Sequence, residues 1–259
     1  MNEFEDRVVV VTGAAQGIGA ALTRRLIKTG ARVAALDAQR DKLALLDKTL
    51  NAGERLSVHG VDVSDAAAVE RAVAAAEEIH GPIDCLASVA GILQMGRIVE
   101  LGDDEWARAL AVNATGPFNA ARAVGKRMIA RRRGAIVVVS SNAAGTPRMA
   151  MGAYAAAKAA ASQMTRCLGL ELAEYGIRCN IVSPGSTDTD MQRGMWRDAS
   201  AKERVIEGSL ESYKAGIPLG KIATADEVSE AILFLLSARA SHITMHDLRI
   251  DGGATLGTG

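Results

Sequence analysis

The stretch Val8-Val9-Val10-Val11-Thr12-Gly13-Ala14-Ala15-Gln16-Gly17-Ile18-Gly19 decides the fold. Its run of valines predicts a strand that is buried on both faces of a parallel sheet. A glycine-rich turn follows, and residues 20–28 then show helical periodicity up to Gly30, a residue type that commonly ends helices. A strand, a glycine turn and a helix in this order predict a pyrophosphate site, because glycines let the backbone approach phosphates and a helix N-terminus offers free N–H groups.

The glycine spacing of this turn is G-x-x-x-G-x-G, which differs from the more usual G-x-G-x-x-G of dinucleotide-binding folds. The alternative is a tight turn that binds nothing, and the flanking strand and helix favour the nucleotide site. Asp37 ends the second predicted strand, residues 31–36, and stands 18 positions after Gly19. A carboxylate there accepts hydrogen bonds from ribose hydroxyls and repels a 2′-phosphate, which predicts NAD rather than NADP. Arg40 could partly offset that repulsion, and Asp37 could instead, or also, cap a helix over residues 40–50.

Strand and helix patterns alternate along the rest of the chain. Further strands are predicted over residues 56–61, 83–88, 135–141, 177–183 and 248–251. Helices are predicted from residue 64 to 79, from Asp103 through Asn113, and over residues 151–174 and 225–236. This alternation predicts an α/β, single-domain Rossmann fold over residues 1–259, with a doubly wound, mostly seven-stranded parallel sheet and helices on both faces.

Residues 187–220 depart from the alternation, because they form a polar excursion between the sixth strand and the next helix. An insertion at the carboxyl edge of a parallel sheet is a common place for a ligand cover, so we expect a substrate lid here. The alternative is a surface helical hairpin without ligand contact.

The composition excludes several classes of protein. The chain has 259 residues, 49% hydrophobic and 23% charged, with a formal net charge of +0. Zero net charge argues against a nucleic-acid binder, and no apolar run is long enough to span a membrane. The acidic N-terminus has no apolar segment of the kind found in signal peptides. Cys85, Cys167 and Cys179 lie in apolar runs, so we expect buried free thiols and a cytoplasmic location.

Tyr154 and Lys158 lie four residues apart in an alanine-rich stretch with helical character. Residues at this spacing share one face of a helix, so the phenol and the ammonium are held side by side. An ammonium favours the phenolate, which makes a tyrosine usable as an acid or base near neutral pH. The pair alone is weak evidence, since the pattern is short, but the nucleotide site upstream strengthens it.

Over essentially its whole length the chain resembles the short-chain dehydrogenase/reductase superfamily. The matching motifs are Thr12-Gly13-x-x-x-Gly17-Ile18-Gly19, Asp62-Val63, Asn113, Ser141, Tyr154-x-x-x-Lys158 and Pro184-Gly185. Ser141 precedes Tyr154 by 13 residues, as the family's serine usually does. Its neighbour Ser140 is the competing candidate, and we expect it to face the other side, because side chains alternate along a strand. One departure is Ser88, which stands where the family usually has asparagine.

The resemblance implies a role for each of these residues. Tyr154 would take the hydroxyl proton while hydride leaves for the nicotinamide, and Lys158 would lower the pKa of the tyrosine and hold the nicotinamide ribose. Ser141 would hydrogen-bond the reacting oxygen, and Asn113 would hold a water that relays protons. The residues implied in binding the cofactor are Gly13, Gln16, Ile18, Asp37, Asp62, Val63, Ala90, Gly91, Tyr154, Lys158, Pro184, Gly185 and Thr187. The resemblance also implies a homotetramer.

A narrower resemblance, to the 2,3-dihydro-2,3-dihydroxybenzoate dehydrogenases, rests on residues 91–96, 146–148, 178–192, 216–221 and 241–244. That group oxidises a carboxylated cyclohexadiene diol with NAD and supplies the catechol unit of siderophores. A buried carboxylate needs a cationic or donor-rich partner. Arg148 is the first candidate, with Gln192 and Arg193 next, and Leu93, Met95 and Met151 are candidates for contact with the ring. The alternative for Arg148 is a surface or subunit-contact arginine.

Three other functions stay open at this point. One is a dehydrogenase of a related cyclohexadiene carboxylate such as dihydro-3-hydroxyanthranilate. Another is a general short-chain alcohol dehydrogenase or ketone reductase, and the third is a non-catalytic nucleotide-bound regulator. A metal site is not expected at His242 and His246, because no third ligand accompanies them. Asp188 and Asp190 resemble a carboxylate pair, and helix N-capping explains them as well.

Overall fold

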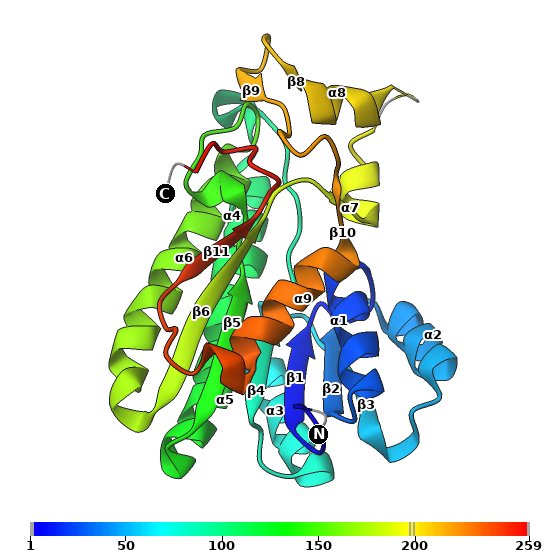
Figure 1. The fold of residues 1–259 in the computed structure, drawn as a ribbon, viewed down its shortest axis with the longest axis vertical. Helices are drawn as coiled ribbons and strands as arrows, with labels where there is room; N and C mark the ends of the chain where they lie inside the picture. Colours follow the sequence, from blue (N-terminus) through cyan, green and yellow to red (C-terminus); the bar gives the residue numbers. More distant parts are fainter. Residues whose placement is uncertain (1–2, 197, 199, 258–259) are drawn as a thin grey trace.

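Seven parallel strands form the central sheet in the computed structural model, which describes residues 3–196, 198 and 200–257 (Figure 1). Their order across the sheet is β3-β2-β1-β4-β5-β6-β11. Their bounds are β1 Val8–Thr12, β2 Arg32–Asp37, β3 Leu56–Gly60, β4 Cys85–Ser88, β5 Gly134–Val139, β6 Ile177–Pro184 and β11 Asp247–Ile250. The predicted seven-stranded α/β sheet is therefore confirmed.

Helices cover both faces of this sheet because the inner strands β1, β2, β4, β5 and β6 are buried on both sides. Val9 and Val11 point into one core with helices α1 Gly17–Lys28 and α9 Ala225–Leu236, which pack against each other. Val8 and Val10 point into the other core, which is shared with α3, α5 and α6. The remaining helices of the sheet are α2 Arg40–Leu50, α3 Ala66–His80, α4 Asp103–Leu110, α5 Gly116–Arg131 and α6 Gly152–Leu172.

The helix that the sequence predicts from Asp103 through Asn113 differs from the structure. Helix α4 ends at Leu110, and a π-helical turn, Ala111–Thr115, connects it to α5. Such bulges widen the helix by one residue and often occur at functional sites. The turn places Asn113 in the interior, where it is completely buried.

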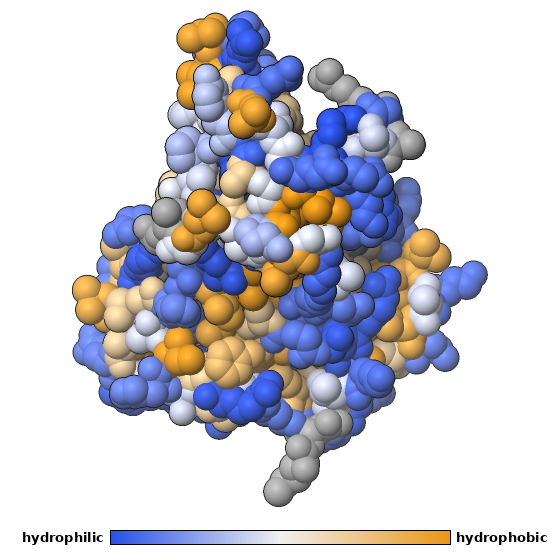
Figure 2. All heavy atoms as spheres, turned by 45° about the horizontal axis from the view of Figure 1, so that its top comes forward, coloured by the Kyte–Doolittle hydropathy of each residue, from blue (hydrophilic) through white to orange (hydrophobic). Residues whose placement is uncertain are grey.

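The polar insertion folds into short elements beyond the carboxyl ends of the strands (Figure 1). They are β7 Thr187–Asp188, α7 Asp190–Arg193, α8 Ala201–Glu207, and a hairpin of β8 Gly208–Ser209 and β9 Lys214–Ala215. A small core of Ile217, Ile222 and Ala254, with Trp196, Val205 and Ile206 packed against it, joins the insertion to residues that follow it in the chain. Strand β7 also pairs with β10 Ala223–Thr224. Seen from this side, hydrophobic side chains are interspersed with hydrophilic ones (Figure 2).

The cysteines only partly follow the expectation from the sequence. Cys85 and Cys179 are buried free thiols, and burial raises the pKa of each to about 12. Cys167 is exposed instead, because the apolar run around it is one face of α6 and Cys167 lies on the other. Within the described residues, no helix combines the length and the apolar character that crossing a membrane requires.

Candidate active site

A cavity of about 460 Å³ opens between the carboxyl ends of the strands and the polar insertion. The strand ends and α6 contribute the candidate catalytic groups, and the insertion contributes the opposite wall. The residues on the sheet side include Ile18, Gly91, Leu93, Met95, Ser141, Arg148, Met151, Tyr154, Lys158, Pro184 and Gly185. Those of the insertion include Thr187, Thr189, Met191, Gln192, Met195, Trp196, Arg204, Ser212, Lys214 and Ile217.

Tyr154 and Lys158 lie on one face of α6, as their spacing predicts, and both side chains are buried. The Lys158 Nζ lies 5.8 Å from the centre of the Tyr154 ring and donates a hydrogen bond to the carbonyl oxygen of Val139 at 2.8 Å. Burial lowers the pKa of Lys158 to about 8. The amine is therefore still largely protonated at neutral pH, and its proton is easily lost.

The expected lowering of the tyrosine pKa is not what the structure shows. Burial raises the pKa of Tyr154, and only a hydrogen bond with Ser141 acts in the opposite direction. The reason is that Lys158 directs its amine to the backbone of β5 rather than to the phenol oxygen. Tyr154 is thus a protonated phenol at neutral pH in this structure.

Ser140 and Ser141 point to opposite sides, as strand alternation predicts. The Ser140 hydroxyl lies 2.7 Å from that of Ser162 and donates to the carbonyl oxygen of Lys158, so it fixes α6 against β5. Ser141 lines the cavity and accepts a hydrogen bond from the backbone N–H of Ala143 at 3.1 Å. Ser141 is therefore the serine next to the phenol.

The side chain of Asn113 binds the backbone next to the site. Its side chain accepts from the N–H of Ile92 at 3.0 Å and donates to the carbonyl oxygen of Ile92 at 2.9 Å. A Cβ atom on Gly91 would lie 2.8 Å from Asn113 Oδ1 and 3.2 Å from Lys158 Nζ, so both side chains converge on Gly91. Two of the four hydrogen-bonding capacities of the Asn113 amide are thus committed to the backbone of Ile92.

The glycine-rich turn has the form that a pyrophosphate requires. A Cβ on Gly13 would lie 2.6 Å from the backbone of Ala90, and one on Gly19 would lie 2.0 Å from the carbonyl oxygen of Gly13, so both positions require glycine. Helix α1 begins without a side-chain cap on Gln16 and without an acidic residue in its first turn. Its first N–H groups are thus available to an anion, and these residues fit a dinucleotide.

Asp37 lies at the edge of the same turn and is 7% exposed. One carboxylate oxygen accepts from the N–H of Ala15 at 3.0 Å, and the other accepts from the N–H of Gln39 at 2.9 Å. The residue at the N-cap of α2 is Gln39 rather than Asp37, so the capping alternative is wrong. Each oxygen keeps lone pairs for ribose hydroxyls.

The other predicted cofactor residues lie around this turn or line the cavity. Gln16 accepts a hydrogen bond from the amine of Lys42. Asp62 accepts from the N–H and the hydroxyl of Ser64, which lowers its pKa, and Val63 is buried against Gly116. Ala90 donates its N–H to the hydroxyl of Thr12 at 3.2 Å.

Three of the four predicted substrate ligands reach the cavity, namely Arg148, Met151 and Gln192. Arg193 does not line it: its guanidinium is exposed and pairs with Asp188 at 2.8 Å and with Asp190 at 3.6 Å. These two carboxylates hold Arg193 and do not cap α7, whose N-cap is Thr189. Arg193 is therefore removed from the candidate set.

Sequence reasoning missed several wall residues of the cavity, above all Lys214, Ser212 and Met195. Lys214 is half-buried, which is unusual for a lysine in a polar insertion. No local sequence pattern predicts that Lys214 lines the cavity, because its place there depends on how the hairpin β8–β9 folds over the strand ends.

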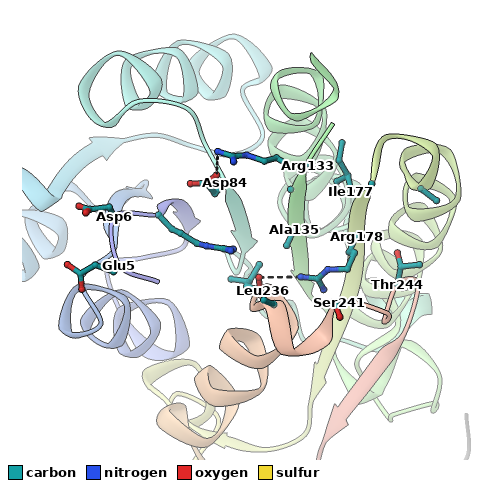
Figure 3. Close-up of a pocket in the computed structure, with 15 residues that line it drawn as sticks. Glu5, Asp6, Asp84, Arg133, Ala135, Ile177, Arg178, Leu236, Ser241 and Thr244 are labelled. Carbon is teal, nitrogen blue, oxygen red and sulfur yellow. Dashed lines mark hydrogen bonds and ion pairs between the residues drawn. The ribbon is translucent and has the colours of Figure 1, made fainter. Parts of the chain in front are cut away.

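A larger cavity, of about 610 Å³, lies at the opposite, amino end of the strands (Figure 3). Several of its charged side chains are engaged: Arg133 pairs with Asp84 at 3.3 Å, and Arg178 donates to the carbonyl oxygens of Leu235 and Leu236 at the end of α9. It contains none of the candidate catalytic residues. We therefore assign the chemistry to the smaller cavity.

Comparison with known proteins agrees with this geometry. A family model described as enoyl-(acyl carrier protein) reductase matches residues 13–255. A 2,3-dihydro-2,3-dihydroxybenzoate dehydrogenase of Bacillus subtilis is 54% identical over 98% of this chain and 98% of its own length, and one of Escherichia coli K12 is 43% identical over 98% and 99%. The crystal structure of a Burkholderia thailandensis oxidoreductase of the short-chain dehydrogenase/reductase family is 34% identical, with a TM-score of 0.86 over 97% of this chain and 94% of that one. The chain therefore belongs to the short-chain dehydrogenase/reductase family.

Proposed function

We propose that the protein oxidises 2,3-dihydro-2,3-dihydroxybenzoate to 2,3-dihydroxybenzoate with NAD. The observation that carries this proposal is a single cavity in which Tyr154, Ser141 and Lys158 face the cationic side chain of Arg148. The first three groups suit the oxidation of an alcohol, and the fourth suits a carboxylate. Two relatives that carry the name of this activity, at 54% and 43% identity over nearly the whole chain, support the choice of substrate.

The residues of the chain divide the work as follows. Ser141 hydrogen-bonds the hydroxyl oxygen of the substrate and sets its distance from Tyr154. Tyr154 takes the hydroxyl proton in its phenolate form and becomes a neutral phenol, and the cationic Lys158 favours the phenolate that this step requires. NAD bound at this site would supply the acceptor for the hydride that leaves the carbon carrying that hydroxyl. The ketone that forms then loses the proton on the neighbouring ring carbon, its oxygen gains a proton, and the ring becomes the aromatic catechol.

Asn113 acts through position rather than contact with the substrate. Its side chain fixes Ile92 and Gly91, and Gly91 lies against the amine of Lys158. An altered residue here would displace the lysine, and with it the charge that Tyr154 needs.

NAD is the cofactor that the nucleotide site favours. The Asp37 carboxylate is held between the glycine-rich turn and the start of α2, where it suits two ribose hydroxyls and opposes a 2′-phosphate. Arg40, the cation nearest in sequence, lies over Gly60.

The substrate side of the cavity combines a charge with an apolar wall. Arg148 is half-buried, and Met95, Met151, Met191 and Met195 supply soft, polarizable surface that suits a diene or aromatic ring. Gln192 is buried and lines the cavity, where its amide suits a hydroxyl or a carboxylate. The residues of the insertion that line the cavity, from Thr187 to Ile217, form its outer wall and act as the lid of the site. The homotetramer and the cytoplasmic location stay predictions.

A substrate panel tests this proposal. Purified protein is mixed with NAD or NADP and with the dihydrodiol, with dihydro-3-hydroxyanthranilate, or with a simple secondary alcohol, and the absorbance of the reduced cofactor is followed. We expect turnover with NAD and the dihydrodiol, with 2,3-dihydroxybenzoate as product. A higher kcat/KM for either other substrate would assign the corresponding alternative function, and binding of NAD without any turnover would indicate a regulator.

A further inference from the structure

Besides Lys158, Arg148 and the ion-paired Arg204, Lys214 is a further cation that lines the substrate cavity. It is the first residue of β9, in the hairpin that crosses above the carboxyl ends of the strands (Figure 1). Its side chain is half-buried and lines the same cavity as Arg148, Ser141 and Tyr154. Two chain segments that are 66 residues apart therefore direct a positive charge into one cavity.

Lys214 and Arg148 form no ion pair with another part of the chain that the structure describes. Among residues 3–196, 198 and 200–257, no carboxylate lies within ion-pair distance of Lys214 or Arg148. Three other cations of the same region are paired: Arg193 with Asp188, Arg204 with Asp198, and Lys221 with Glu227.

The acid that acts on Arg148 is Asp251, which raises its pKa, but this carboxylate is already occupied. It accepts hydrogen bonds from Asn142 at 3.3 Å, Thr255 at 2.7 Å and the N–H of Gly253 at 3.0 Å. It therefore compensates the charge of Arg148 only in part.

The two cations also repel each other. Burial and the charge of Arg148 both lower the pKa of Lys214, and burial lowers the pKa of Arg148. Half-buried like charges without a counter-ion are unfavourable, and an anion bound between them would remove both the repulsion and the loss of hydration. A carboxylate fits this place, because it accepts hydrogen bonds from two donors at once.

We propose that Lys214 and Arg148 bind the carboxylate of the substrate together, so that the substrate joins the hairpin of the lid to the body of the protein. This inference rests on the proposed function and adds a specificity residue to it. The diol end of the ring then faces Ser141 and Tyr154, and Lys214 is a positioning residue that takes no part in the proton transfer. Binding of the carboxylate would also hold the lid over the site, since Lys214 is part of its hairpin.

The test compares Lys214→Met, Lys214→Arg and the control Lys202→Met, a change of an exposed lid lysine on α8 that does not line the cavity. Each variant is assayed with NAD on the dihydrodiol and on the same diene diol without its carboxyl group. A lost charge-assisted contact lowers kcat/KM by about 10- to 100-fold. We expect Lys214→Met to show this loss on the carboxylated diol, mainly through KM, with most of it restored in Lys214→Arg.

On the diol without a carboxyl group, wild type and Lys214→Met should have the same kcat/KM. An equal loss on both diols would mean that Lys214 only supports the fold of the lid, and an unchanged KM for the carboxylated diol would also overturn the inference. Failure of the wild-type protein to oxidise the carboxylated diol at all would instead remove the proposed function, and this inference with it. Thermal melting of each variant checks that it is folded.

Discussion

The substitution Asp37→Asn removes a negative charge from the nucleotide site while the size of the side chain stays the same. In the structure the two Asp37 oxygens each accept one backbone N–H, from Ala15 and from Gln39. An amide has only one acceptor oxygen, so one of these buried N–H groups loses its partner. We expect this to lower the free energy of unfolding by about 1–3 kcal/mol.

The effect on cofactor choice is larger. Hydrogen bonds from ribose hydroxyls to a charged acceptor contribute about 2 kcal/mol, which NAD would lose. A 2′-phosphate about 4 Å from the carboxylate is repelled by roughly 4 kcal/mol at an effective dielectric constant near 20, and by about half of that after screening by salt and water. The preference for NAD over NADP should therefore fall by about 4 kcal/mol, or roughly a thousandfold.

The assay measures kcat/KM for NAD and for NADP at a saturating concentration of the dihydrodiol, in wild type and in Asp37→Asn. The control is Asp41→Asn, which removes an exposed carboxylate from the first turn of α2 and should leave the ratio unchanged. If Asp37→Asn folds and keeps the wild-type ratio of NAD to NADP, the carboxylate does not read the ribose and the reasoning is refuted.

Three further predictions concern the turn, the acid stability and the pH profile. Gly19→Ala places a Cβ 2.0 Å from a backbone oxygen of the glycine-rich turn, so NAD binding measured by calorimetry should be lost. The control is Gly125→Ala in α5, whose Cβ meets only an ordinary contact at 3.6 Å, and this variant should bind NAD normally. Burial lowers the pKa values of His59 and His80, whose rings share the hydroxyl of Ser57, so the unfolded chain binds more protons below about pH 6.5. The urea midpoint of wild type should thus decrease as pH falls through that range, and that of His80→Gln should decrease less. An equal decrease in wild type and His80→Gln would exclude His80 as the cause. The pKa of Lys158 is lowered to about 8, so kcat/KM should fall as pH rises above this value and the amine loses its charge. The fall should disappear in Lys158→Arg, because a guanidinium stays charged. If kcat/KM of this variant still falls above pH 8, another group is the cause.

Local patterns predicted the sheet because each strand carries its own evidence. The four valines of β1 face two cores in alternation, and the same alternation correctly placed Ser140 against α6 and Ser141 in the cavity. The helical spacing of Tyr154 and Lys158 likewise needed no tertiary information.

The features that sequence reasoning missed depend on contacts between distant segments. Arg193 and Lys214 both lie in the polar insertion, and no pattern tells which is neutralised by nearby aspartates and which enters the cavity. The direction of the Tyr154 pKa was also missed, because it depends on burial and on the hydrogen bond between Lys158 and Val139 rather than on helical spacing.

The helix that was expected to continue through Asn113 is interrupted for a similar reason. The π-helical turn forms where the Asn113 side chain binds both backbone groups of Ile92, a residue 21 positions away. This tertiary contact overrides the local helical pattern.

The most direct test compares wild type and Tyr154→Phe for formation of 2,3-dihydroxybenzoate from the dihydrodiol and NAD. The substitution removes one hydroxyl from a buried ring, and binding of NAD, measured in parallel, reports that the site is still formed. The account predicts rapid product formation by wild type and a loss of at least about a hundredfold in kcat for the variant, the lower range for loss of a general base. A variant that binds NAD and forms product at the wild-type rate would contradict it.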